Sequence, residues 1–147
     1  MVTNIAGSTT GFANLTVVSS NSALICRIGD RAIVIYKPIA FERPLWAFPD
    51  GTLAHREVAA FLASEALGLW IVPPTVLRAG PFGLGAVQSW VDVDESIDPL
   101  DLIEREDPRL RWIALFDALV NNADRKVGHL LPTADGSIQG VDHGICF

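Results

Sequence analysis

The chain has 147 residues, 50% of them hydrophobic, and a mean hydropathy of +0.33; these values predict one globular domain and exclude a disordered chain. Its formal net charge at pH 7 is −6, and no run of basic residues offsets the acids. This balance argues against nucleic acid or an anionic membrane as the main partner.

Targeting and membrane signals are absent from the sequence pattern. The first residues lack a basic region followed by an apolar core, and no apolar run reaches the length of a membrane span. The cysteines Cys26 and Cys146 follow no spacing pattern, which favours buried thiols in a reducing compartment over a disulfide. We therefore expect a cytoplasmic protein without an integral membrane segment.

The first part of the chain predicts an antiparallel meander. Three apolar or β-branched runs, at 15–18, 23–28 and 31–36, are separated by turn residues. Small hydroxyl and amide residues form the first turn, and such a turn can hold phosphate oxygens through its backbone N–H groups and hydroxyls. An ordinary polar hairpin turn is the alternative. The residues of this turn are Ser19, Ser20, Asn21 and Ser22.

Lys37 follows the third of these runs, directly before Pro38. Because proline has no N–H with which to continue strand pairing, the lysine is predicted at a strand end, near the rim of the sheet. The segment 41–51 is aromatic and interrupted by prolines, which makes it too irregular for a helix or a strand. We expect it to fold back as a lid or to pack against the sheet edge.

A helix is predicted over 53–67, with Thr52 as its N-cap. Glu57 and Glu65 lie on this helix, and one of them can reach Lys37 as an internal ion pair. For either glutamate alone, a solvated position on the surface is the commoner state.

Two further strands, at 75–77 and 85–91, complete a predicted lobe of five strands and one helix. The segment 92–107 holds eight acids and a single arginine, which favours a solvated connector with a short helix at 100–104. The sequence thus predicts a single domain in three parts: an N-terminal lobe at about 1–91, the acidic connector, and a partial C-terminal lobe at 108–147.

The last part of the chain begins with a helix predicted from Pro108 to Val120. All its residues from 112 to 120 except Asp117 are apolar, which predicts a helix buried on nearly all sides. A buried aspartate must be hydrogen-bonded, and we expect Asp117 to cap backbone N–H groups of the loop after the helix. A short hairpin over 130–141 follows that loop.

Two loops in this region contain most of the candidate chemistry. The first has the Asp-x-Lys spacing of a kinase catalytic loop, and the second stands where kinases have Asp-Phe-Gly. A phosphate-binding turn, a lysine after the third strand and a glutamate on the next helix precede them in the order that phosphoryl transfer requires. The loops are Asp124-Arg125-Lys126-Val127-Gly128-His129 and Asp142-His143-Gly144.

On these motifs the chain resembles the atypical kinases of the phosphatidylinositol 3-/4-kinase superfamily, in particular an actinobacterial branch, and more distantly HipA-like kinases. The similarity extends from about Ser19 to Phe147. It is most specific at 36–38, 42–46, 48–53, 56–60, 72–74, 121–126 and 141–144.

The resemblance implies a two-lobed, protein-kinase-like α+β fold with an antiparallel sheet and one helix in the N-lobe. A truncated helical C-lobe would contain the catalytic loop and the short hairpin. The implied ligands are ATP and Mg²⁺, with Mn²⁺ as the alternative metal, and the nucleotide would lie between the lobes. Trp90 would then stack near the adenine; a buried structural tryptophan is the other interpretation.

The resemblance also assigns roles to individual residues. Lys37 would bind the phosphates and Glu57 would hold Lys37 in place. Asp124 would position the acceptor hydroxyl, with Lys126 as the second catalytic residue of that loop. Asp142 would bind the metal.

Two departures from the superfamily pattern matter. His129 stands where the wider superfamily has a metal-binding asparagine, and imidazole is a poor ligand for Mg²⁺. It would either contact a phosphate or shift the metal preference toward Mn²⁺. The chain also ends at Phe147, just after the predicted metal-binding residue, so we expect either a fragment or a site that a partner chain completes.

Two other functions remain open at this point. The first is a pseudokinase or interaction module that binds nucleotide without turnover. The second is a metal-dependent hydrolase whose ligands would be Asp124, His129, Asp142 and His143, although their spacing is not that of a zinc site. For a kinase, the acceptor hydroxyl would belong to a protein, a small metabolite or a lipid, and the acidic chain gives the lipid little support.

Overall fold

The central strand of the main sheet, β5 (Ala32–Pro38), ends at the lysine and proline singled out above. The computed structural model describes residues 3–5, 15–17, 19–20, 23–29 and 32–147. The fold is α+β: an antiparallel five-stranded sheet with strand order β3-β4-β5-β7-β6, two small two-stranded sheets and few helices. The other strands of the main sheet are β3 (Ser19–Ser20), β4 (Ala23–Ile28), β6 (Thr75–Gly80) and β7 (Gly83–Ser89).

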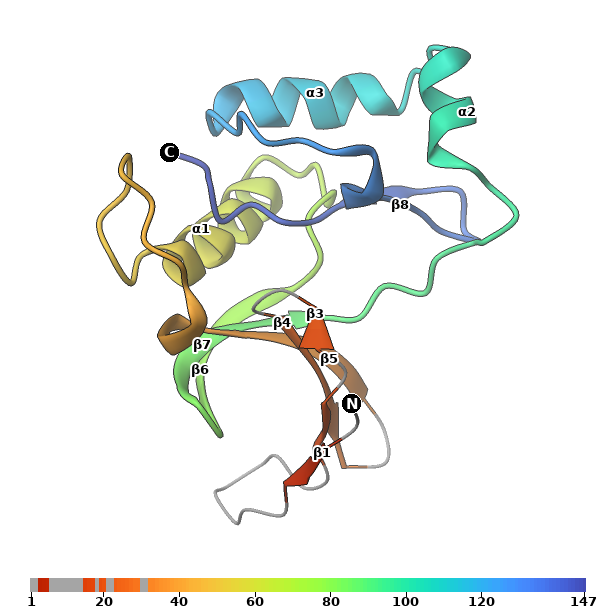
Figure 1. The fold of residues 1–147 in the computed structure, drawn as a ribbon. Helices are drawn as coiled ribbons and strands as arrows, with labels where there is room; N and C mark the ends of the chain where they lie inside the picture. The colour runs from red at the N-terminus through yellow and green to blue at the C-terminus, as the bar shows by residue number, and fades with distance from the viewer. Residues whose placement is uncertain (1–2, 6–14, 18, 21–22, 30–31) are drawn as a thin grey trace.

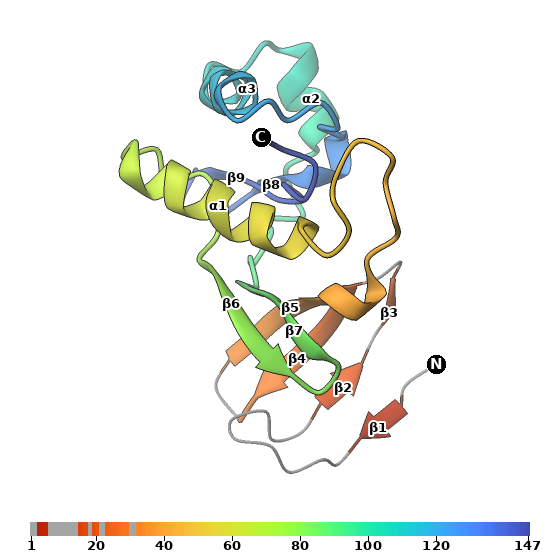
Figure 2. The same ribbon diagram turned by 90° about the vertical axis from the view of Figure 1, so that its left-hand side faces the viewer.

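Most of the remaining elements surround the loops that contain the candidate site, whereas a small two-stranded sheet near the N-terminus lies away from them (Figure 2). In Figures 1 and 2 the main sheet lies at the bottom, α1 crosses above it, and α2, α3 and the hairpin β8–β9 lie on the far side of α1. These elements are β1 (Thr3–Ile5), β2 (Leu15–Val17), α1 (Leu53–Ala66), α2 (Pro99–Glu104), α3 (Leu110–Leu119), β8 (Leu130–Pro132) and β9 (Ile138–Gly140), with 3₁₀ turns at η1 (Ile39–Phe41) and η2 (Val127–His129).

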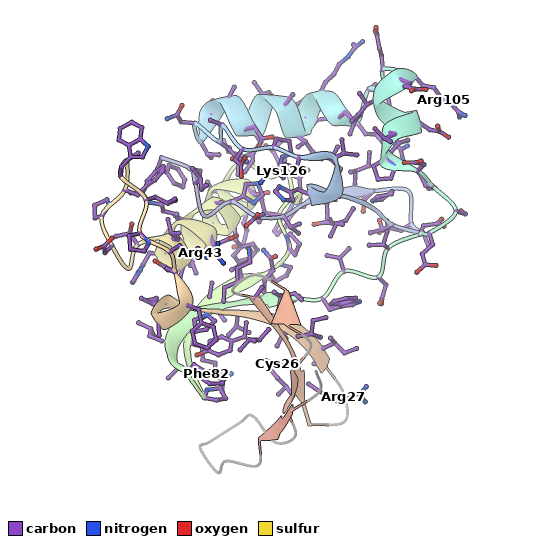
Figure 3. The ribbon with its side chains drawn as sticks, in the orientation of Figure 1. Cys26, Arg27, Arg43, Phe82, Arg105 and Lys126 are labelled. Carbon is purple, nitrogen blue, oxygen red and sulfur yellow. The ribbon has the colours of Figure 1, made fainter. Side chains whose placement is uncertain are left out.

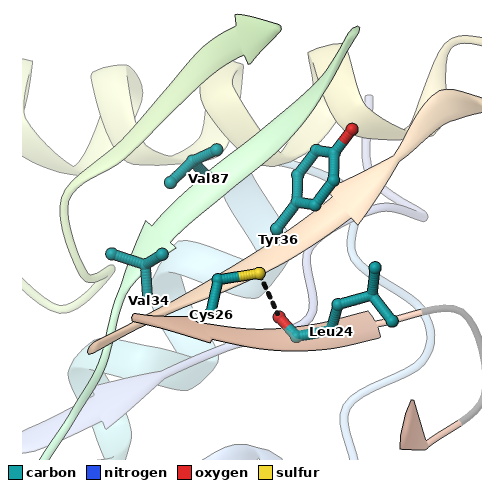
Figure 4. Packing of buried hydrophobic residues seen from close by; sticks show 5 residues of the cluster. All are labelled: Leu24, Cys26, Val34, Tyr36 and Val87. Atoms are coloured by element: carbon teal, nitrogen blue, oxygen red, sulfur yellow. Dashed lines mark hydrogen bonds between the residues drawn. The ribbon is translucent and has the colours of Figure 1, made fainter. Parts of the chain in front are cut away.

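One face of the main sheet forms its own hydrophobic cluster. Alternate residues of β4 and β5 point to this face, as the period of two in a strand requires. Tyr36 and Cys26 are completely buried there (Figure 4). The cluster consists of Leu24, Cys26, Val34, Tyr36 and Val87. Cys26 and Cys146 are both buried free thiols, as predicted, and burial raises the pKa of Cys26 to about 11 and that of Cys146 to about 12.

A close approach of β7 to β5 depends on glycine. The Tyr36 hydroxyl donates a hydrogen bond to the Gly83 carbonyl at 2.6 Å, which draws the tyrosine ring onto the β6–β7 hairpin. At Gly85 a Cβ atom would meet the carbonyl oxygen of Lys37 and lie 2.7 Å from the Cα of Pro38. Only a residue without a side chain fits between these backbone atoms.

The start of α1 confirms the predicted helix and corrects its cap. The Thr52 side chain makes no capping hydrogen bond, because its own backbone is already helical (φ −105°, ψ −8°) and its hydroxyl donates to the Pro49 carbonyl. The carboxylate of Glu42 accepts from the N–H groups of Leu53 at 3.1 Å and Ala54 at 2.8 Å. A side chain from the preceding segment therefore satisfies amides that the helix itself leaves unpaired.

The prediction that the helix before the catalytic loop is buried on nearly all sides is wrong. Of α3, only Ile113, Phe116 and Asp117 are buried. Trp112 remains 56% exposed and Leu119 59% exposed. The helix packs through one face only, where Phe116 joins a cluster with α1 and the C-terminal segment.

No helix within the described part of the chain is long and apolar enough to cross a membrane.

Replacing Gly85 with alanine tests the close approach of β7 to β5. We expect Gly85→Ala to lower the free energy of unfolding by about 1–3 kcal/mol, because the backbone must shift to accept the methyl group. Urea denaturation measures this change. Gly128→Ala is the matched control, since no heavy atom lies within 4 Å of a Cβ at that position. Equal stability of the two variants would contradict the steric explanation.

Candidate functional site

Three charged side chains from distant parts of the chain meet at the C-terminal end of the central strand, β5. Lys37 comes from β5, Glu57 from α1, and Asp142 from the loop after β9. The lysine Nζ forms an ion pair with Glu57 Oε1 and lies 3.1 Å from Asp142 Oδ1. The predicted internal ion pair of Lys37 is thus confirmed with Glu57 as the partner, whereas Glu65 is exposed.

Glu57 is only 2% exposed, so the solvated position considered from sequence is wrong for this residue. Its second oxygen, Oε2, accepts a hydrogen bond from the backbone N–H of His143 at 3.1 Å. Both oxygens of this buried carboxylate are therefore paired, which a buried charge requires. The same residue holds the lysine and the loop that contains Asp142.

Opposing influences determine the ionisation of Lys37 and Asp142. Burial acts to lower the pKa of Lys37, but Glu57 and Asp142 outweigh it and raise this pKa above its ordinary value. Burial likewise acts to raise the pKa of Asp142, and Lys37, His129 and Lys126 outweigh it and lower this pKa. Both groups are therefore charged at neutral pH.

The catalytic-loop candidates Asp124 and Lys126 pair with each other. Lys126 Nζ donates to Asp124 Oδ2 at 2.9 Å, and the two side chains are 62% and 41% exposed. The hydrogen bond to Asp124 is the main cause of the raised pKa of Lys126, and the charge of Asp142 adds to it. Lys126 therefore lies in the electrostatic field of both carboxylates.

Asp117 does not cap backbone N–H groups, and that prediction is wrong. Its carboxylate accepts two hydrogen bonds from Arg125, from Nε at 2.8 Å and from an Nη at 2.7 Å, and a third from the Asn122 side chain. The planar guanidinium matches the carboxylate in a bidentate pair, which is stronger than bonds to backbone amides. The backbone N–H of Asn122 bonds instead to the Asp117 carbonyl.

Arg125 also binds the second loop, a role that the sequence reasoning missed. It donates to the Val141 carbonyl at 2.7 Å, and an Nη lies 2.7 Å from Nε2 of His143. A guanidinium can only donate, so Nε2 accepts and the imidazole is neutral, with its proton on Nδ1. Burial is the main cause that lowers the pKa of His143 to about 4, and the charge of Arg125 lowers it further. The lone acid in an apolar helix was the available signal that a buried cation lies nearby.

His129 lies on the other side of Asp142. Its Nε2 is 3.3 Å from Asp142 Oδ2, while Lys37 contacts Oδ1. Burial is the main cause that lowers the pKa of His129, so the ring is neutral at neutral pH. Its Nδ1 is buried and has no hydrogen-bond partner among the described residues.

A cavity of about 280 Å³ opens beside these groups. Lys37, Glu57 and Asp142 form one side, and Ala23, the first residue of β4, also lines it. The other lining residues are Pro38, Glu42, Arg43, Leu45, Leu53, Ala54, Gly144 and Ile145.

The other residues predicted to bind the nucleotide are Ser19, Ser20, Asn21, Ser22 and Trp90. Ser19 and Ser20 form the short strand β3, paired with Leu24 and Ala23 of β4, so the prediction that both lie in a turn is wrong. Asn21 and Ser22 lie outside the described residues. Trp90 follows the end of β7 and does not line the cavity. It is 41% exposed, so the interpretation of Trp90 as a buried structural tryptophan is wrong.

The side chains at the site suit a metal ion that takes most of its ligands from phosphate groups and water. Among the described residues, no group of three or more His, Cys, Asp or Glu side chains is placed to hold a metal ion. Mg²⁺ in nucleotide sites needs only one or two carboxylates, because phosphate oxygens and water complete its coordination. Asp142 meets this requirement, whereas the four-ligand metal site considered from sequence receives no support.

Comparison with known proteins identifies one similar chain. The protein is 40% identical over 166 residues to "Protein Rv2133c" of Mycobacterium tuberculosis, and the match covers 87% of this chain and 60% of that protein. The chain thus spans about three-fifths of the length of this relative. No family model matches the chain. The name of the relative states no activity, so the function is argued from the site.

Acid should destabilise the protein through His143. Its pKa is about 4 in the folded protein and about 6.5 when unfolded, so the unfolded state binds more protons between these values and stability falls as the pH falls. We expect a loss of about 3 kcal/mol from pH 7 to pH 4. Urea denaturation across this range measures it.

His143→Gln keeps an acceptor for Arg125 but does not titrate, so its pH dependence should be flatter by this amount. His55→Gln, at an exposed histidine, is the control and should behave as the unmodified protein does. If His143→Gln shows the same pH dependence as His55→Gln, the neutral buried imidazole is refuted.

Proposed function

We propose that the protein is an ATP-dependent phosphotransferase with a kinase-like fold, which transfers the terminal phosphate of ATP to a hydroxyl acceptor. The arrangement of Lys37, Glu57 and Asp142 at one cavity is the observation that carries this proposal. Phosphoryl transfer relies on positioning and charge stabilisation, for which a lysine held by a buried glutamate is suited. The order of these residues along the chain adds support.

Lys37 would bind the phosphates of the nucleotide. Its charge is retained at neutral pH, because Glu57 and Asp142 both raise its pKa. The buried ion pair with Glu57 also restricts the lysine to one orientation, so little conformational entropy is lost on binding. The hairpin of β3 and β4, which includes Ser19 and Ser20, would cover the phosphates, by analogy with phosphate-binding turns.

Asp124 would accept a hydrogen bond from the acceptor hydroxyl and orient its oxygen. Lys126, 2.9 Å from Asp124, would neutralise part of the charge that develops on the transferred group. Asp142 and His129 are the residues that would hold a divalent metal. A metal held there would offset part of the negative charge of the phosphate groups.

The adenine would lie away from the described cavity. Of the candidates, Lys37 and Asp142 line the cavity and Trp90 does not, which fits the phosphate end of a nucleotide site. Stacking of Trp90 on the adenine stays a prediction, compatible with its 41% exposure after β7.

A nucleotide-binding pseudokinase is the second candidate. The observation that favours it is the position of His129, whose Nε2 faces Asp142 where an oxygen ligand would suit Mg²⁺ better. Binding of ATP without phosphate transfer or hydrolysis would support this alternative over the phosphotransferase.

Nucleotide binding can be tested by thermal unfolding with ATP or ADP and Mg²⁺ or Mn²⁺. A ligand at about 100 times its Kd stabilises the folded state by about 2.7 kcal/mol, which raises the Tm measurably. We expect this rise for the unmodified protein, and its loss in Asp142→Asn. The double variant Lys37→Met with Glu57→Gln should also lose it.

The double variant is needed because Lys37→Met alone would leave the buried Glu57 charge without its partner, which destabilises a protein by about 3–5 kcal/mol. Glu65→Gln, on the exposed side of the same helix, is the control and should retain the full rise in Tm. If neither nucleotide raises the Tm of the unmodified protein with either metal, the proposal fails.

His129 should favour Mn²⁺ over Mg²⁺, because Mn²⁺ accepts an imidazole ligand more readily. We expect a larger nucleotide-dependent rise in Tm with Mn²⁺, and His129→Asn should reverse the order. Titration calorimetry with each metal and ATP measures the preference directly. An unchanged order in His129→Asn would show that His129 is not a ligand.

A further inference from the structure

Arg43 is a cation at the cavity whose partner is missing from the described residues. It lies on the segment between η1 and α1 and lines the cavity together with Lys37 and Asp142. In Figure 3, Arg43 lies beside the first turn of α1, with the sheet below it and the loop of Lys126 above it. Among the described residues its side chain has no ion pair, hydrogen bond or ring contact.

The other charged groups around the cavity are occupied. Lys37 is paired with Glu57 and Asp142. Glu42, next to Arg43 in the chain, accepts from two backbone N–H groups at the start of α1. The helix N-terminus is therefore already occupied by a carboxylate and does not compete for a second anion.

Arg56, a nearby arginine, stabilises the fold through the contacts of its side chain. Its guanidinium donates to the carbonyls of Cys146 at 2.6 Å and Phe147 at 2.9 Å and lies over the ring of Phe48. Arg43 is exposed and has no contacts of this kind among the described residues, so its guanidinium is accessible to a ligand in the cavity.

The chemistry of the cavity favours a phosphate group opposite Arg43. Its walls are largely apolar, with Pro38, Leu45 and Ile145 among them, and charges interact more strongly beside such walls than in water. A guanidinium presents a planar fork of donors that matches two phosphate oxygens. A neutral ligand would not match the positive charge of this donor fork.

We propose that Arg43 is an anion-binding residue of this site, which with Lys37 binds a phosphate group in the cavity. The proposal rests on the proposed phosphotransferase function for its choice of phosphate. The group would be either a phosphate of the nucleotide or a phosphate on the acceptor. Both sources present the same chemistry to Arg43, and the probes below distinguish them.

The test is titration calorimetry on the full chain with three probes, each with Mg²⁺: ATP, ADP and inorganic pyrophosphate. Arg43→Ala should weaken ATP binding about 10-fold or more, the effect of losing a hydrogen-bonded charged partner. The affinity of Arg43→Lys for ATP should lie between that of the unmodified protein and that of Arg43→Ala, because lysine keeps the charge but lacks the planar fork of donors. Arg105→Ala is the charge-matched control, since Arg105 is exposed on the opposite side of the molecule in Figure 3 and pairs only with Asp101 at 3.8 Å.

The outcomes separate the two proposals. A loss for ATP but not for ADP assigns Arg43 to the terminal phosphate, and an equal loss for both assigns it to a phosphate that the two share. Pyrophosphate binding that depends on Arg43, in a protein that does not bind ATP, supports the anion site with a phosphorylated acceptor and refutes the proposed function. ATP and pyrophosphate binding that is equal in Arg43→Ala and Arg105→Ala overturns the role of Arg43 and leaves the proposed function in place. Failure of all three probes to bind the unmodified protein overturns both.

Discussion

The buried carboxylate of Glu57 joins the three parts of the molecule that meet at the site. One oxygen pairs with Lys37 of the central strand, and the other accepts from the backbone of the loop after the C-terminal hairpin. Because Glu57 is only 2% exposed, its charge destabilises the fold unless both Lys37 and the His143 backbone N–H are in place. The side chain of Glu57 therefore bridges the sheet, α1 and the C-terminal loop.

A second ionic contact does the same on the other side of the loop. Arg125 binds Asp117 of α3 in a bidentate pair and also contacts the Val141 carbonyl and the His143 ring. The loop between β9 and the C-terminus is thus attached to α1 on one side and to α3 on the other. Asp142 stands between these two attachments, at a position where its φ is +63°.

This arrangement links stability to the proposed chemistry. Lys37 and Asp142 are the residues best placed to bind phosphate and metal, and the lysine is also the charge partner of buried Glu57. Residues that both hold the fold and line the cavity cannot be changed singly without affecting both properties. Arg43 differs from them, because it lines the same cavity and has no structural contact among the described residues.

The sequence by itself determined most of the elements and their order, though not the short strands β1 and β3, because apolar periodicity, Gly and Pro act locally along the chain. It also placed Lys37 at a strand end and Glu57 on the next helix, close enough to expect their pairing. Only the tertiary structure decided that Glu42 caps α1, that Asp117 binds Arg125, and that one apolar face of α3 stays exposed. These outcomes depend on side chains brought together from separate segments, and an apolar run looks the same in the sequence whether or not another element covers it.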